Sequence, residues 1–124
     1  MQYVRQMEDE DLAIIEELKN WGCDVEDAMT RFLDDEEFYV TCLYTMVQDS
    51  AYDKLGEALR TGDVQEAFEQ AHTLKGVLSN MGLTPIYEIV VELVEPLRNG
   101  NGDNLMPVYE NLLKANEHLK EIIA

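Results

Sequence analysis

One face of a helix predicted in the middle of the chain carries a histidine, a lysine, a glycine and a serine. These residues are His72, Lys75, Gly76 and Ser79. They share one face because successive residues of a helix are rotated by about 100° around its axis. A neutral imidazole has a lone pair that can attack phosphorus, and a phosphoryl group on the ring would carry negative charge. Lys75, one turn after His72, is placed to give that group a charge-assisted hydrogen bond. The pattern therefore favours transfer of a phosphoryl group to His72.

Small residues keep the surface beside His72 low. A glycine inside a helix costs about 1 kcal/mol relative to alanine, so Gly76 needs a physical reason, and the close approach of a partner's active site is one. Ser79 extends the same strip. Phe68 precedes His72 by one turn, and its ring either helps a partner to dock or packs sideways against a neighbouring helix. We therefore take Phe68, Gly76 and Ser79 as the candidate partner-binding residues.

Each of these residues also has a simpler explanation when it is taken alone. A single histidine on a helix is most often a solvated polar residue, Lys75 an ordinary surface lysine, and Gly76 a point of close helix packing. His118 is the plain case, because Glu121 rather than a cation follows it one turn later. The combination on one face distinguishes His72 from His118.

The helix that holds His72 has clear start and stop signals. Asp63 and Glu66 form a capping-box pattern, and Gly82 stands where a helix end needs a residue that takes positive φ. We expect a helix from Asp63 to about Met81. Its buried stripe is predicted to consist of Ala67, Ala71, Leu74, Leu78 and Met81.

Apolar periodicity and turn residues predict the other helices. They run from about 8 to 19, from 25 to 32, from about 35 to 60, from 85 to between 95 and 99 where Pro96 ends or kinks the helix, and from 104 or 105 to the C-terminus. Together they predict an all-α fold. We expect an antiparallel up-down four-helix bundle with one or two short N-terminal accessory helices, formed as a single domain over residues 1–124.

Composition limits the partners. The net charge is -17, from 26 acidic and 9 basic residues, which opposes binding to nucleic acid or to an anionic membrane and leaves proteins as the expected partners. The chain has no apolar run long enough for a membrane span and no signal-peptide core at its start. Cys23 and Cys42 have no metal-binding spacing, so reduced thiols are expected. We therefore expect a cytoplasmic protein, and a monomer.

The residues from Ala71 to Gly76, in the order Ala-His-x-Leu-Lys-Gly and followed by Gly82, resemble the signature of histidine-containing phosphotransfer (HPt) domains. Weaker similarity covers most of the chain, including the segment from Asp24 to Phe32. The resemblance implies a four-helix bundle with accessory N-terminal helices. It also implies that His72 is the phosphoacceptor, that Lys75 supports the phosphate, and that Gly76 gives clearance for a response-regulator receiver domain.

These inferences predict a phosphorelay intermediate that carries a phosphoryl group between a histidine kinase or receiver aspartate and another receiver aspartate. It would be a phosphocarrier rather than an enzyme. The sequence has no nucleotide-binding glycine loop and no acidic metal cluster, so we expect no cofactor, with Mg²⁺ supplied by the partner. Two alternatives stay open: the phosphoacceptor domain of a larger chemotaxis-type kinase, and a helical module that binds receivers without phosphotransfer. A hydrolase with His72 as general base is the weakest alternative, because no nucleophile is fixed near it by sequence.

Overall fold

A computed structural model of the protein describes the backbone of residues 2–124 and the side chains of residues 9–124. Every regular element in this range is a helix, so the predicted all-α class is confirmed. The helices are α1 (Gln2–Trp21), α2 (Val25–Arg31), α3 (Glu36–Met46), α4 (Ala51–Thr61), α5 (Val64–Asn80), α6 (Thr84–Arg98) and α7 (Met106–Ile123). None of the described helices is long and apolar enough to cross a bilayer.

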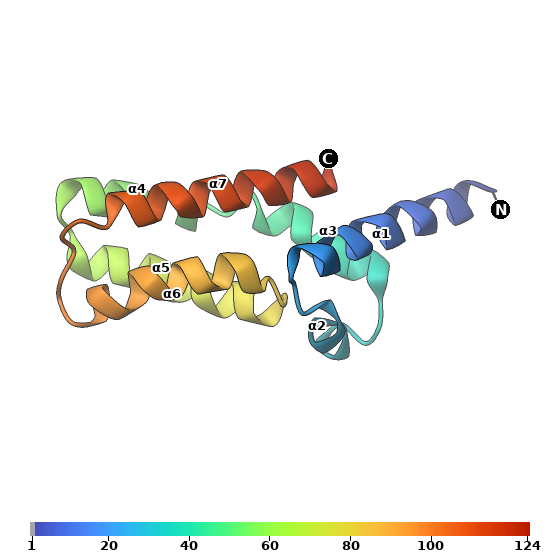
Figure 1. The fold of residues 1–124 in the computed structure, drawn as a ribbon, viewed down its shortest axis with the longest axis horizontal. Coiled ribbons are helices and arrows are strands. Elements are labelled where there is room, and N and C mark those ends of the chain that lie inside the picture. The colour runs from blue at the N-terminus through green and yellow to red at the C-terminus, as the bar shows by residue number, and fades with distance from the viewer. Residues whose placement is uncertain (1) are drawn as a thin grey trace.

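Helices α4, α5, α6 and α7 lie side by side and form the body of a helical bundle (Figure 1). α5 packs against both α4 and α6, while α7 packs against α6 and α4. α1 and α3 pack against each other and against α7, and α1 extends beyond the end of the bundle (Figure 1). The buried apolar side chains of the described helices belong to one cluster. This continuous core gives α5 a rigid support.

The prediction of one helix from about 35 to 60 was wrong, because the helix is interrupted between the end of α3 and the start of α4. The Asp49 carboxylate accepts a hydrogen bond from the backbone N–H of Ala51, at 2.8 Å, and so competes with continued helix. The carbonyl of Val47 accepts a bond from the Asn116 side chain of α7, at 3.2 Å. Asn116 is buried, so the break is satisfied from inside the core.

The leading helix is also longer than predicted. α1 has 20 residues and begins at Gln2, whereas the sequence pattern placed its start at about residue 8 and described the accessory helices as short. The periodic apolar residues begin only at Leu12, but the preceding residues include good helix formers such as glutamine, arginine and methionine. At the other end of α1, the rings of Trp21 and His118 meet edge to face at 4.6 Å and fasten α1 to α7.

Candidate functional site

The helix that carries His72 begins as the sequence predicts. The Asp63 carboxylate accepts a bond from the backbone N–H of Glu66, at 3.1 Å, and caps α5. The reciprocal half of the capping box is replaced, because the backbone N–H of Asp63 donates to the carbonyl of Ala58 and the Glu66 carboxylate accepts from Gln70. α5 therefore starts at a fixed point, about two turns before His72.

The other end of α5 is held by side chains from the N-terminal helices. Arg31 donates from Nε to the carbonyl of Asn80, at 3.0 Å, and from Nη2 to the carbonyl of Ser79, at 3.2 Å. The buried Tyr39 hydroxyl donates to the carbonyl of Met81, at 2.7 Å. Burial raises the pKa of Tyr39, which keeps this donor protonated. The bonds to Asn80 and Met81 satisfy carbonyls that the helix end leaves free, while the carbonyl of Ser79 also accepts the backbone N–H of Gly82. Sequence reasoning missed both Arg31 and Tyr39.

The turn after α5 also connects the bundle to the N-terminal helices. Gly82 has φ +68°, as predicted for a helix end, and its carbonyl accepts the backbone N–H of Asp24 at 2.8 Å. α6 follows at once: Leu83 occupies the cap position predicted for Thr84, and makes no side-chain cap bond. Pro96 lies in the last turn of α6, and the helix ends at Arg98, within the predicted range.

The two faces of α5 have the predicted character. Ala67, Ala71, Leu74, Leu78 and Met81 are all buried, which confirms the predicted apolar stripe. His72, Gly76 and Ser79 are exposed, whereas Lys75 and Phe68 are half-buried. Packing of the stripe against α4 and α6 thus leaves the imidazole on the outside of the bundle.

The sequence left open whether Phe68 helps a partner to dock or packs sideways against a neighbouring helix, and its observed position lies between these two alternatives. Its half-buried ring packs against the core and also stacks on the His72 imidazole, with ring centroids 5.6 Å apart and an interplanar angle of 18°. The Arg98 guanidinium lies over the same ring, 5.4 Å from its centroid. Phe68 therefore contacts both the His72 imidazole and the guanidinium of Arg98, which is a second cation near the site. Arg98 was missed because nothing in the sequence indicates that the end of α6 lies beside Phe68.

The glycine beside His72 is not required by packing within the chain. A Cβ built on Gly76 has no atom of the protein within 4 Å, apart from the neighbouring residues and the local helix backbone. Gly56 of α4 is the opposite case, since a Cβ there would lie 2.8 Å from Cε2 of the Tyr109 ring. Close helix packing therefore explains Gly56 and does not explain Gly76.

The surface beside His72 is open to a ligand. Among the described side chains, neither His72 nor Lys75 takes part in a hydrogen bond or ion pair within the chain, so both are free to meet a ligand. A cavity of about 240 Å³ opens beside Ser79 and is lined also by Asp27, Thr84 and Tyr87. The residues with described side chains contain no group of three or more potential metal ligands.

A family model described as "Hpt domain" matches residues 45–123, which is more than half of the chain and includes all of α4 to α7. Neither the curated proteins nor the solved structures gave a match. The match includes His72, Lys75 and Gly76 with the helices that surround them. The chain therefore belongs to the Hpt domain family.

Proposed function

We propose that this protein is a phosphorelay intermediate in which His72 accepts a phosphoryl group from a receiver aspartate or a histidine kinase and passes it to another receiver aspartate. Membership of the Hpt family indicates phosphotransfer in two-component signalling, and Hpt domains interact with receiver domains and kinases. The observation that carries the proposal is the exposed His72 on a rigid helix, with Lys75 and the open Gly76 on the same face.

The transfer needs little from the protein itself. The unprotonated ring nitrogen of His72 attacks the phosphorus of an aspartyl phosphate, the N–P bond forms as the acyl O–P bond breaks, and the aspartate leaves as a carboxylate. The other ring nitrogen keeps its proton. In the onward transfer, the carboxylate of a second receiver aspartate attacks the phosphorus of phosphohistidine, the O–P bond forms as the N–P bond breaks, and His72 returns to its neutral form. The partner would supply Mg²⁺ and the transfer machinery, so we propose a phosphocarrier without catalytic machinery or cofactor of its own.

Lys75 is proposed to support the phosphoryl group. Removing its charge by Lys75→Gln should remove a charge-assisted hydrogen bond worth about 1.5–3 kcal/mol, which corresponds to a roughly 10- to 100-fold slower uptake of phosphate by His72. Lys114→Gln is the matched control, because this exposed lysine lies on α7 and its loss changes the net charge equally. Rates of label transfer from a phosphorylated receiver measure the effect. Equal rates for both variants would remove Lys75 from the site.

Gly76 is proposed to give clearance for the partner, and this predicts opposite effects on stability and transfer. Gly76→Ala should raise the free energy of unfolding by up to about 1 kcal/mol, because alanine favours helix and its Cβ meets no atom. Gly76→Leu should slow transfer strongly while the domain stays folded. Denaturant unfolding and label transfer are measured on the same samples. A normal rate for Gly76→Leu would show that the partner does not approach this residue.

The proposed partner surface consists of Phe68, Gly76 and Ser79 around His72. The net charge of -17 does not favour long-range attraction to an acidic receiver pocket, so docking would depend on local contact with Phe68 and its neighbours. We further propose an antiparallel up-down arrangement of the four bundle helices, a single domain over residues 1–124, and a monomer that works in the cytoplasm with its receiver and kinase partners.

A phosphotransfer profile against purified kinases and phosphorylated receivers tests the proposal and identifies the partner. We expect uptake of acid-labile phosphate, which distinguishes phosphohistidine from phosphoserine. A helical module that only binds receivers would bind them after His72→Ala and would never carry phosphate. The phosphoacceptor domain of a chemotaxis-type kinase would be recognised by dimerisation and ATP-binding segments in the same gene product.

A further inference from the structure

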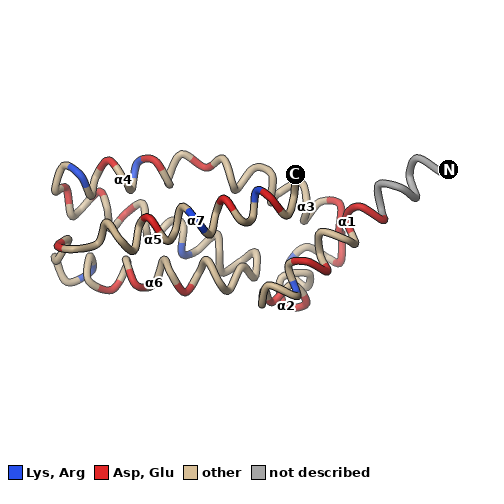
Figure 2. The backbone as a smooth tube through the Cα atoms, turned by 45° about the horizontal axis from the view of Figure 1, so that its top comes forward, with Lys and Arg blue, Asp and Glu red and all other residues tan. Residues whose placement is uncertain are grey.

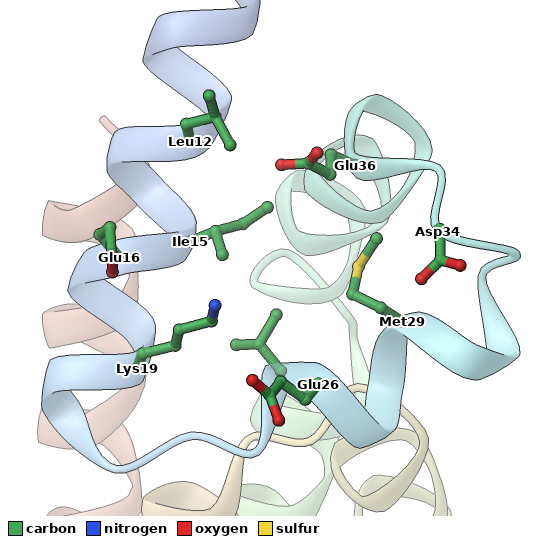
Figure 3. Close-up of a pocket in the computed structure, with 9 residues that line it drawn as sticks. Leu12, Ile15, Glu16, Lys19, Glu26, Met29, Asp34 and Glu36 are labelled. Carbon is green, nitrogen blue, oxygen red and sulfur yellow. The ribbon is translucent and has the colours of Figure 1, made fainter.

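A groove with an apolar floor lies among the N-terminal helices. It has a volume of about 660 Å³ and is formed by α1, α2 and the start of α3. Leu12 and Ile15 of α1 point toward Met29 of α2 across this space (Figure 3), and Val25 completes the floor. Leu12 is 48% exposed, although the other three are buried residues of the core. Leu12 thus supplies most of the apolar surface that the groove exposes, beside a floor formed by core residues.

The rim of the groove is acidic. Glu16, Glu26, Asp34 and Glu36 line it, and Lys19 is the one cation among its lining residues. None of these four carboxylates forms an ion pair among the described side chains. Figure 2 shows that acidic residues gather at this end of the molecule, on α1, α2 and the beginning of α3. The rim therefore has four carboxylates against one lysine, so most of its negative charge is not neutralised by the chain.

Charge crowding beside the groove is felt by a neighbouring carboxyl group. Partial burial, and then the charges of Glu37, Glu10 and Glu36, raise the pKa of Asp11. A cation bound at this end would relieve this repulsion. Leu33 lies next to Asp34 of the rim. It has a positive φ of 54°, and its apolar side chain is 88% exposed. A non-glycine residue rarely adopts this conformation, and burial of the exposed Leu33 side chain against a partner would be favourable.

The groove lies outside the part of the chain that carries the proposed relay. Its lining residues fall between Leu12 and Glu36, whereas the Hpt match begins at residue 45. No residue of α5 lines it. Phosphotransfer at His72 therefore gives no reason for an apolar floor with an unneutralised acidic rim.

We infer that this groove binds a basic amphipathic segment of a partner protein, with apolar side chains on the Leu12–Met29 floor and Lys or Arg side chains against the acidic rim. This mode combines burial of an apolar helix face with charge complementarity. A second copy of the chain is a poorer occupant, because each copy carries a net charge of -17 and like charges oppose the contact. The inference is independent of the proposed relay.

Binding of a synthetic peptide tests the inference. The probe is a helical peptide of leucine and lysine with leucines on one face, and the control peptide has the same composition in scrambled order. We expect the amphipathic peptide to bind at least about tenfold more tightly, because only it presents an apolar face to the floor. Chemical shift changes in an NMR titration should fall on α1, α2 and the start of α3. Equal binding of the two peptides, or shifts centred on α5, would overturn the inference.

Variants of the full chain distinguish the effect of the rim carboxylates on peptide binding from the effect of the overall charge. Glu16→Lys combined with Glu26→Lys should weaken binding of the amphipathic peptide by roughly tenfold or more. Glu88→Lys combined with Glu92→Lys, on the exposed face of α6, changes the net charge equally and should have a small effect. Leu12→Ser tests the floor at an exposed position, where folding is preserved, and should also weaken binding. Equal losses from the two charge-reversed pairs would contradict a specific rim.

Two further measurements identify the occupant and its relation to the relay. His72→Gln should bind the peptide as wild type does, so loss of phosphotransfer and loss of groove binding can be told apart. Analytical ultracentrifugation should show the same association state for the wild type and for Leu12→Ser, because the groove is not expected to bind a second copy of the chain. Self-association that Leu12→Ser abolishes would assign the groove to a second copy of the chain and would overturn the proposed basic partner.

Discussion

Replacement of His72 by glutamine is expected to abolish phosphate uptake from a phosphorylated receiver or kinase, while the fold is unchanged. The glutamine amide nitrogen has no free lone pair and cannot act as the nucleophile. The side chain of His72 is exposed and forms no hydrogen bond with the described residues, so the substitution should cost little stability. Transfer of radiolabel followed over time measures the loss, and circular dichroism checks the fold.

His118 provides the matched control for this experiment, because the chain has two histidines. His118 packs edge to face on Trp21, which joins α7 to α1, and lies 3.8 Å from a carboxylate oxygen of Glu121 on its own helix. His118→Gln should keep full phosphate uptake and lose at most a little stability. Uptake that survives His72→Gln, or that is lost in His118→Gln, would contradict the assignment of the phosphoacceptor.

Gly82→Ala is expected to give the largest loss of stability. Positive φ costs an alanine about 1–2 kcal/mol, and the new Cβ would lie 2.9 Å from the carbonyl carbon of Asp24 and closer still to its oxygen. Backbone cannot move aside as a side-chain tip can, so overpacking adds about 1–3 kcal/mol. The total loss in the free energy of unfolding should be about 2–5 kcal/mol, measured by denaturant titration.

Gly100→Ala separates the two causes. Gly100 has φ +80°, but a Cβ there meets no atom within 4 Å, so this variant should lose only the conformational part, about 1–2 kcal/mol. A larger loss at Gly82 would locate the difference in the contact between the α5–α6 turn and Asp24. Equal losses in the two variants would show that the N-terminal helices do not depend on this contact.

The placement of α5 could be predicted from sequence because its signals are local. Asp63 and Gly82 mark its ends within a few residues of the chain, and the apolar stripe from Ala67 to Met81 determines which face is buried. The exposure of His72 follows from that stripe. Local hydrogen bonds and helical periodicity were sufficient there, since neighbouring helices could only cover the apolar side.

The features that could not be predicted depend on residues far apart in the sequence. At the break between α3 and α4, the side chain of Asn116 donates to the carbonyl of Val47. The C-terminal end of α5 is capped by Arg31 of α2 and Tyr39 of α3. Arg98 reaches the site only because the end of α6 lies beside Phe68. Sequence periodicity gives the faces of each helix but not which helix ends meet, so these contacts required the folded chain.

The central claim is that His72 carries the phosphoryl group, and locating the phosphate in the chain tests it most directly. The protein is phosphorylated by a receiver or kinase, digested at neutral pH so that a P–N bond survives, and mapped by mass spectrometry. The proposal predicts phosphate on the peptide that contains His72 and none on the peptide that contains His118. Phosphate on His118, on a carboxylate or on a hydroxyl group, with His72 unmodified, would contradict it.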